Sequence, residues 1–235
     1  MTTLTSVDAV GAAIRAAAAP CARTLVGIVG APGAGKSTLA AAVVDRLEGT
    51  AALLPMDGFH LPQARLIELG RRDRMGAPDT FDLDGFLATL ALLRASGADA
   101  AALCGNIGTI GGIGGADTMG DIGNSGEVVS APGFDRTREE PVPGLISISP
   151  ELPTVVVEGN YLLFDTGGWE RVSPLLDLVF FVAVDRDIRL RRLIDRHVRF
   201  GKSPAAAEAW ALGPDERNAV VIEATAARAD HIVRL

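Results

Sequence analysis

A glycine-rich stretch near the start of the chain contains the residue types that hold a phosphate group. It consists of Gly30, Ala31, Pro32, Gly33, Ala34, Gly35, Lys36, Ser37 and Thr38. Gly30–Ser37 fits the spacing G-x-x-x-x-G-K-[ST] of a P-loop, in which backbone N–H groups surround the β-phosphate, the lysine reaches the β- and γ-phosphates, and the hydroxyl ligates Mg²⁺. We therefore predict that residues 30–38 bind ATP, that Lys36 acts in catalysis and that Ser37 is a Mg²⁺ ligand.

The segments on either side favour this interpretation over an ordinary glycine-rich turn. Thr24–Val29 is a short apolar run with β-branched residues and predicts a buried strand, whereas Ser37–Leu47 has helical spacing. A P-loop requires this order of strand, loop and helix. The chain has only two lysines, Lys36 and Lys202, and neither follows an asparagine, so the N-K-x-D pattern of GTPases is absent.

Carboxylates follow two other apolar runs. Asp57 comes after Ala51–Met56, and Glu158 comes after Thr154–Val157. The carboxyl ends of parallel strands meet at one edge of a sheet, where ligands bind. We predict that Glu158 is a Mg²⁺ ligand beside the P-loop and that Asp57 accepts the proton of an acceptor hydroxyl. A surface glutamate and a turn-capping aspartate are the plain alternatives.

The order of the predicted elements indicates an α/β fold. Helical stretches are predicted at Ser6–Ala19, Ser37–Leu47, Leu83–Ala95, Arg186–Phe200 and Pro214–Ala229. Strands are predicted at Thr24–Val29, Ala51–Met56, Thr154–Val157, Leu178–Val184 and His231–Leu235. Apolar strands that alternate with helices are typical of a parallel sheet covered on both faces. We expect a single P-loop NTPase domain over residues 1–235, built on a five-stranded parallel sheet.

Residues 105–128 interrupt this rhythm as a glycine-rich insertion. From Gly105 to Gly126 glycine recurs at every third position except 117, and isoleucines fill much of a second phase. A period of three matches a polyproline-II-like helix with glycines along one edge. A flexible insertion is the interpretation that we favour. An ordered one would form a protrusion or an oligomer contact, which leaves a homodimer open.

Composition limits the partners and the compartment. The formal net charge is −7, which gives no long-range attraction to nucleic acid or to anionic lipid. Cys21 and Cys104 are too few for a disulfide framework or a zinc site. The sequence has no signal peptide pattern and no run of about 18 apolar residues. We therefore expect a cytoplasmic protein with a small-molecule acceptor and with neither nucleic acid nor a membrane as partner.

Taken together, these motifs resemble the uridine kinase and pantothenate kinase group of P-loop kinases, and more specifically the bacterial nucleoside/nucleotide kinase family that includes kinases linked to fructose uptake. The matching stretches are Gly30–Ser37, Met56–Pro62, Pro78–Asp82, Ala131–Pro141, Val155–Leu163, Val182–His197 and Gly213–Leu235. They keep the family's order and cover nearly the whole chain apart from the N-terminal helix and the insertion. The resemblance implies ATP and Mg²⁺ as cofactors and a kinase-type lid helix.

The resemblance also implies catalytic roles. Asp57 matches the acid that faces the acceptor hydroxyl, and Glu158 matches the acid near Mg²⁺. Arg192 and Arg196 fall on the lid helix, whose arginines close over the transferring phosphoryl group, and residues four apart share a helix face. The remaining arginines of this helix are expected to form a solvated face, namely Arg186, Arg189, Arg191 and Arg199.

For the acceptor, the resemblance implies contacts from His60, Asp79, Phe134 and Arg136. The chain departs from relatives with nucleoside or pantothenate specificity in the segment Phe134–Glu140, where it carries mostly charged residues. That departure weakens the transfer of uridine or pantothenate as the substrate.

The combined pattern predicts an ATP-dependent kinase that phosphorylates a hydroxyl of a small metabolite, such as a nucleoside, a sugar or a pantothenate-like compound. Two alternatives stay open. A nucleoside monophosphate kinase would use arginines such as Arg136 and Arg138 on the acceptor side and would need no base at Asp57. A nucleotide-sensing module would instead couple ATP binding to a partner contact through the insertion.

Overall fold

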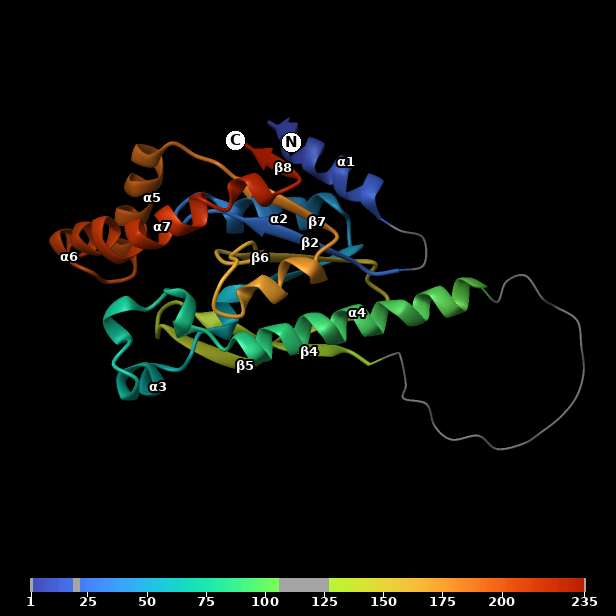
Figure 1. The fold of residues 1–235 in the computed structure, drawn as a ribbon, viewed down its shortest axis with the longest axis horizontal. Helices are drawn as coiled ribbons and strands as arrows, with labels where there is room; N and C mark the ends of the chain where they lie inside the picture. The colour runs from blue at the N-terminus through green and yellow to red at the C-terminus, as the bar shows by residue number, and fades with distance from the viewer. Residues whose placement is uncertain (1, 19–21, 106–126, 235) are drawn as a thin grey trace, which may run out of the picture.

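The computed structural model describes residues 2–18, 22–105 and 127–234, which alternate between strands and helices (Figure 1). The main sheet consists of β1 Thr2–Leu4, β2 Thr24–Val29, β3 Ala51–Pro55, β6 Thr154–Gly159, β7 Leu178–Val182 and β8 His231–Val233. A second sheet consists of β4 Val129–Asp135 and β5 Glu140–Ile148. The α-helices are α1 Val7–Ala17, α2 Lys36–Arg46, α3 Gln63–Glu68, α4 Leu83–Gly105, α5 Arg186–Arg199, α6 Pro204–Trp210 and α7 Glu216–Glu223. Short 3₁₀ turns include η1 Met56–Phe59, η2 Arg72–Arg74 and η3 Pro78–Thr80.

The main sheet is parallel throughout and has the strand order β1-β8-β7-β2-β6-β3. All five predicted strands are present, and the α/β P-loop fold is confirmed. The predicted strand count is wrong by one, because Thr2–Leu4 adds a sixth strand beside β8. A three-residue strand at a sheet edge is too short to show an apolar pattern, so its pairing comes only from the folded neighbour.

Both faces of the main sheet are covered, because successive side chains of a strand point to opposite faces. Leu25 and Val29 of β2 belong to one apolar core, which includes residues of α4 and α7. Val26 and Ile28 belong to the other core, against α1 and α2. Every residue of β2 is buried. The continuous apolar run that predicts this strand therefore results from its central place between two layers.

The antiparallel pair β4–β5 is not predicted by the sequence. Its strands carry Pro132, Pro141 and Pro143, which disfavour a strand assignment. The pair stands apart from the main sheet and shifts register between Ala131 and Gly133. An edge strand tolerates proline where no ladder hydrogen bond is needed. Tertiary contacts with η1 therefore decide this hairpin more than local propensity does.

The helical C-terminal region differs from the prediction at its start. The sequence predicts a single helix over Pro214–Ala229, whereas helical structure runs from α6 through a π-helical turn, Ala211–Asp215, into α7. Pro214 lies inside this turn. Proline lacks an N–H and clashes with the preceding turn of an α-helix, and a wider turn accommodates both problems. The proline thus marks a local widening instead of a helix start.

Arg189 on α5 corrects another prediction, that of a wholly solvated arginine face. Its side chain is 1% exposed and pairs with Glu216 and, at 3.7 Å, with Glu223. Both glutamates belong to α7, which covers this side of α5. Arg186, Arg191 and Arg199 are exposed as predicted. The sequence of α5 alone does not reveal that a later helix packs over one of its arginines.

Some predictions fall where the structure makes no description. Of the insertion predicted at residues 105–128, positions 106–126 lie outside the described residues, and so do Cys21 and the side chain of Cys104. Leaving those positions aside, the helices are all too short or too polar to cross a membrane.

A buried arginine, Arg23, ties the start of β2 to two other segments. It is 3% exposed. Its guanidinium donates hydrogen bonds of 2.6 to 3.3 Å to the carbonyls of Leu93, Ser149, Pro150 and Leu152 and to the Ser96 hydroxyl. Arg23 therefore joins α4 and the loop before β6 to the central strand.

Replacing Arg23 by methionine is expected to lower the free energy of unfolding by on the order of 3 kcal/mol, because hydrogen bonds to a charged group contribute about 1.5–3 kcal/mol and the carbonyls would lose their donor. Urea unfolding measures this loss. Arg23→Lys should fall between the two proteins, and Arg15→Met, at an exposed site on α1, should stay within about 0.5 kcal/mol of the wild type. Equal stability of the Arg23 and Arg15 variants would contradict the role of Arg23.

Candidate active site

The P-loop lies between β2 and α2, as predicted. Lys36 is the first residue of α2, so the positive end of this helix points into the loop. Gly33 has a φ of +79°, and a Cβ there would lie 2.8 Å from the carbonyl oxygen of Arg189 and 2.7 Å from Leu193. The loop therefore packs directly on α5, and this position requires glycine for its backbone angle and for its close contact.

Lys36 and Ser37 both approach Glu158, at the end of β6. The Lys36 ammonium lies 3.7 Å from one Glu158 oxygen and donates to the carbonyl of Ala31 at 3.3 Å. The Ser37 hydroxyl donates to the other Glu158 oxygen at 3.2 Å. Burial lowers the pKa of Lys36, opposed by the charges of Glu158 and Asp57. The structure thus brings the two predicted metal ligands together beside the P-loop lysine.

The chemistry of Ser37 and Glu158 fits Mg²⁺. Mg²⁺ prefers oxygen ligands and is commonly held by one or two carboxylates together with substrate phosphates and water. Burial raises the pKa of Glu158, opposed by the charge of Lys36. Among the described residues no group of three or more His, Cys, Asp or Glu side chains could hold a metal. A Mg²⁺ ion here would therefore take its remaining ligands from phosphate oxygens and water.

Asp57 lies in η1, directly after β3, and faces Arg136 from the hairpin. Its Oδ2 accepts a hydrogen bond from the Arg136 guanidinium at 2.7 Å. Burial acts to raise the pKa of Asp57, but His60, Arg136 and Lys36 together outweigh burial and lower it. Asp57 is therefore a carboxylate at neutral pH.

His60 forms part of an aromatic wall next to Asp57. Its Nδ1 lies 2.8 Å from the Asp57 backbone carbonyl. A carbonyl only accepts, so Nδ1 carries the hydrogen, and burial lowers the pKa of His60. When the ring is neutral, Nε2 is left as a hydrogen-bond acceptor. The ring lies against Phe81 and Phe134, with centroid distances of 4.0 and 4.9 Å.

The hairpin carries Phe134 and Arg136 to this wall. A Cβ on Gly58 would lie 2.0 Å from the Pro132 carbonyl oxygen, so only glycine lets β4 sit directly on η1. Both Phe134 and Arg136 line the same pocket as Asp57 and His60. These predicted acceptor contacts are therefore gathered around the predicted base.

The two arginines predicted on the lid helix are placed differently. Arg196 lines the pocket. Burial lowers the pKa of Arg196, followed by the charge of Arg136, while Asp215, Asp57 and Glu158 oppose them. Within the described part of the chain, the ion pairs found do not involve Arg196. Arg192 instead lies outside the pocket, with its guanidinium 3.4 Å from the Ala34 carbonyl of the P-loop.

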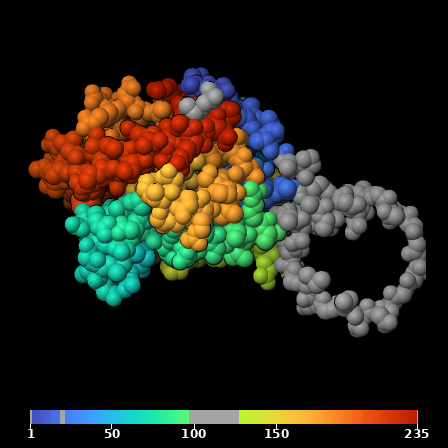
Figure 2. Space-filling model, in the orientation of Figure 1, coloured from blue at the N-terminus to red at the C-terminus, as the bar shows by residue number. Residues whose placement is uncertain are grey.

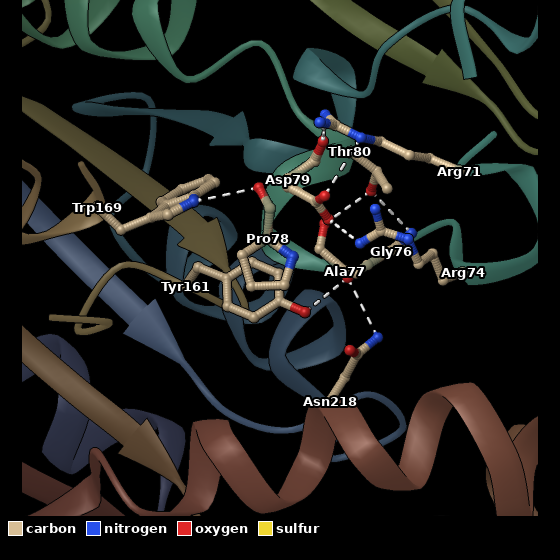
Figure 3. Close-up of polar contacts among 10 residues, drawn as sticks. All are labelled: Arg71, Arg74, Gly76, Ala77, Pro78, Asp79, Thr80, Tyr161, Trp169 and Asn218. Carbon is tan, nitrogen blue, oxygen red and sulfur yellow. Dashed lines mark hydrogen bonds and ion pairs between the residues drawn. The ribbon is translucent and has the colours of Figure 1, made fainter. Parts of the chain in front are cut away.

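Asp79, a predicted acceptor contact, lies outside the pocket lining. It pairs with Arg74 at 2.6 Å and with Arg71 at 3.3 Å (Figure 3). Nearby, the carbonyl of Gly76 accepts hydrogen bonds from the Tyr161 hydroxyl at 2.6 Å and from the Asn218 amide at 3.2 Å. Asp79 thus helps to fix the loop of residues 71–80, one wall of the pocket.

Several pocket residues were missed by sequence reasoning. The acceptor side also contains Arg72, Glu139, His197, Lys202, Trp210, Asp215 and Asn218. His197 Nε2 lies 2.7 Å from Asp215. The rarity of lysine could have indicated Lys202, because both lysines of the chain line this pocket. Arg72 and Glu139 lie far from the C-terminal residues 197–218 in the sequence, and no local pattern joins these three segments.

The pocket is partly open to solvent and is lined by residues of the P-loop, η1, the hairpin, the loop of residues 71–80 and the C-terminal helices. In Figure 2 the C-terminal helices, in orange to red, lie directly against the segment around residues 60–80, in teal. The pocket thus has a P-loop side, with Lys36, Ser37 and Glu158, and an acceptor side that includes Asp57. Such a site can hold a phosphate chain and present it to a second small molecule.

No model of a known protein family matches the chain. An ATP-dependent kinase-like protein, notR′ of Aspergillus versicolor, is 34% identical over 170 residues, which cover 70% of this chain and 84% of that protein. A crystal structure from Silicibacter sp. TM1040, described as a fructose transport system kinase, is 33% identical with a TM-score of 0.77, and the match covers 97% of this chain and 98% of that one. A Schizosaccharomyces pombe protein with a uridine kinase name is 28% identical over 211 residues, 85% of this chain and 76% of that protein. The chain therefore belongs to the family of ATP-dependent kinase-like proteins with a P-loop.

Proposed function

We propose that this protein transfers the γ-phosphoryl group of ATP to a hydroxyl group of a small metabolite, such as a nucleoside, a sugar or a pantothenate-like compound. This proposal rests on one observation. A single pocket is lined by Lys36, Ser37, Glu158, Asp57 and Arg196. The first three are suited to the phosphate donor, and Asp57 is suited to an acceptor hydroxyl. Phosphoryl transfer depends on holding the two reactants in line, and this arrangement supports that geometry.

In the proposed reaction, Lys36 and the P-loop amides hold the phosphates of ATP. Ser37 and Glu158 would hold Mg²⁺, which would neutralise charge on the phosphate oxygens. Asp57 accepts a hydrogen bond from the acceptor hydroxyl, orients its oxygen toward the γ-phosphorus and takes its proton as the new P–O bond forms. The bond between the γ-phosphorus and the β–γ bridging oxygen breaks in the same step, and ADP leaves with that oxygen. Arg196 stabilises the negative charge on the transferring group.

Contact between Arg136 and Asp57 argues for this function over a nucleoside monophosphate kinase. The carboxylate of Asp57 would repel a phosphate placed at its side of the pocket, whereas a neutral hydroxyl can donate to it. Arg136 lies 2.7 Å from Asp57, so a phosphate bound by Arg136 would lie beside that carboxylate. The sensing alternative rests on the insertion, most of which lies outside the described residues.

The Arg136–Asp57 pair predicts a change in pH dependence. Asp57 must be deprotonated to act, so activity falls as the pH drops through its pKa, which the charges of His60, Arg136 and Lys36 hold below the ordinary value of 3.8. Arg136→Met removes one of the charges that lower this pKa, so we expect the acid limb of kcat/KM to move to higher pH. Arg138→Met is the matched control, because the Arg138 side chain is 82% exposed. An unmoved limb in Arg136→Met would contradict the pairing.

Acceptor-dependent ADP formation tests the proposed function. The protein is mixed with Mg-ATP and a panel of nucleosides, sugars, sugar acids, sugar phosphates and vitamins that carry hydroxyl groups. We expect at least one acceptor to raise ADP formation well above the rate with ATP alone, and Lys36→Met to abolish the increase. If no acceptor raises the rate while ATP still binds, the proposed function is wrong.

A further inference from the structure

One end of the pocket carries charged residues for which the phosphate chemistry has no use. Arg72 in η2, Glu139 in the turn of the hairpin and Lys202 in the turn after α5 all line it. These residues come from three segments that are far apart in the sequence. Lys202 is notable because the chain has only two lysines and the other is the P-loop lysine. All the other lysine or arginine positions of the chain hold arginine, and both lysines line this pocket.

The charges at this end are unbalanced. Glu139 pairs with Arg72 at 2.6 Å and with Lys202 at 3.6 Å, so one carboxylate is shared by two cations. Lys202 also lies over the ring of Trp210, 5.0 Å from its centroid. Among the described residues, Arg72 and Lys202 have Glu139 as their only ion-pair partner. One positive charge at this wall is therefore left without a counter-charge.

Ion pairs and hydrogen bonds hold the loop that carries Arg72. On the loop of residues 71–80, Arg71 and Arg74 are both bound to Asp79, which leaves Arg72 to face the pocket (Figure 3). The Gly76 carbonyl holds the same loop to Tyr161 and Asn218. Binding sites gain affinity when their charged groups are held in place before the ligand arrives.

Lys202 lies beyond the end of α5 that is remote from the P-loop. Arg192 of α5 touches the P-loop at Ala34, and α5 ends at Arg199. At about 1.5 Å per residue, the end of α5 lies roughly 10 Å farther along the helix. Lys202 follows this end, and it lines the same pocket as Asp57 and Arg72, so one bound molecule could contact all three.

We infer that the acceptor of the proposed kinase is an anion, with a carboxylate or phosphate group that Arg72 and Lys202 bind while its hydroxyl meets Asp57. Arginine and lysine are the usual partners of such groups. Glu139 is paired with both cations and therefore competes with the ligand for them. The inference deepens the proposed function and rests on it, because it names the class of acceptor.

A purely structural account assigns the three residues to a latch that ties the lid to the hairpin and binds nothing. The two interpretations predict opposite effects of Glu139→Gln on the affinity for an anion. If an anion competes with Glu139, then Glu139→Gln frees both cations and should tighten anion binding. If the cluster is only a latch, Glu139→Gln should loosen the pocket and weaken binding, as the loss of either cation would.

The test measures binding of matched alcohols to the full chain, with the P-loop filled by a non-hydrolysable ATP analogue and Mg²⁺. Pairs include glycerol with glycerate and with glycerol phosphate, and fructose with gluconate and with fructose phosphate. We expect an anionic member of at least one pair to bind at least about tenfold more tightly than its neutral partner. Arg72→Met and Lys202→Met should each weaken that anion about 10- to 100-fold, and Glu139→Gln should strengthen it.

Arg65→Met, at an exposed ion pair on α3, is the control that should leave binding unchanged. Equal binding of neutral and anionic members, no binding by any anion, or an anion preference that survives both cation substitutions would overturn the inference. The carboxylate and phosphate members of the panel distinguish a hydroxy acid from a sugar phosphate. Turnover of neutral acceptors would overturn the inference and leave the kinase intact, whereas anions that bind through Arg72 and Lys202 without being phosphorylated would overturn the kinase instead.

Discussion

Replacing Arg196 by methionine is expected to lower kcat by about 10³- to 10⁵-fold, the range found when an arginine finger is removed from a phosphoryl-transfer site. Arg196 lines the pocket between the P-loop and Asp57, and in the described part of the chain it has no ion-pair partner to neutralise it. Its charge is therefore available to the transferring group, where charge spreads over the phosphoryl oxygens. Because this interaction strengthens in the transition state, KM for ATP should change little.

Arg199→Met is the matched control for Arg196. Arg199 lies on the same helix and is exposed, so its loss should leave kcat within about twofold, as expected for a surface substitution away from a site. Steady-state kinetics of both variants with a turned-over acceptor provide the comparison. Equal rates in Arg196→Met and Arg199→Met would remove Arg196 from the reaction.

Asp57→Asn is expected to lower kcat by about 10²- to 10⁴-fold, the usual contribution of a positioned general base. Asparagine keeps the size of the side chain and can still accept a hydrogen bond, but it takes no proton at neutral pH. Its pair with Arg136 is weakened because the carboxylate charge is gone. ATP binding depends on the P-loop, so the Kd for a non-hydrolysable ATP analogue should stay within about threefold of wild type.

Single-turnover kinetics and calorimetric titration separate these two effects of Asp57→Asn. The matched control is Asp73→Asn, which removes a carboxylate from an exposed position in η2. We expect wild-type turnover in that control. Full activity in Asp57→Asn, or an equal loss in Asp73→Asn, would exclude a catalytic carboxylate at Asp57.

The donor half of the site could be predicted because its chemistry is local in the sequence. Gly30–Ser37 is one continuous motif between a strand and a helix, and its backbone angles follow from its glycines. Glu158 lies at the end of β6, and Asp57, on the acceptor side, follows β3; the apolar runs of both strands are visible in the sequence. Parallel strands bring their carboxyl ends together, so the sequence alone is enough to expect these side chains at one edge of the sheet.

The acceptor half could be predicted only in part, because it is assembled from distant segments. Helical spacing puts Arg192 and Arg196 on one face of α5, but only the fold decides that Arg196 lines the pocket and that Arg192 rests on the P-loop. Asp79 belongs to a recognisable motif, yet it is bound by two arginines of its own loop. Helical spacing predicts which residues share a face of a helix, but it does not predict which part of the protein contacts that face.

Three structural features escaped prediction for similar reasons. Strand β1 is short and gains its place by pairing with β8. The hairpin β4–β5 contains prolines that disfavour strands, and it is held by contact with η1. Arg189 is buried and pairs with two glutamates of α7. Each depends on a partner remote in the sequence, which local propensity cannot supply.

The central claim is that this chain moves the γ-phosphoryl group of ATP onto a metabolite hydroxyl. The most direct measurement incubates the protein with a deproteinised metabolite extract and Mg-ATP that carries heavy oxygen in its γ-phosphate, followed by mass spectrometry. We predict that one metabolite acquires a labelled phosphoryl group with wild-type protein and that none does with Asp57→Asn. Labelled inorganic phosphate as the only product, or no transfer of label at all, would contradict the account.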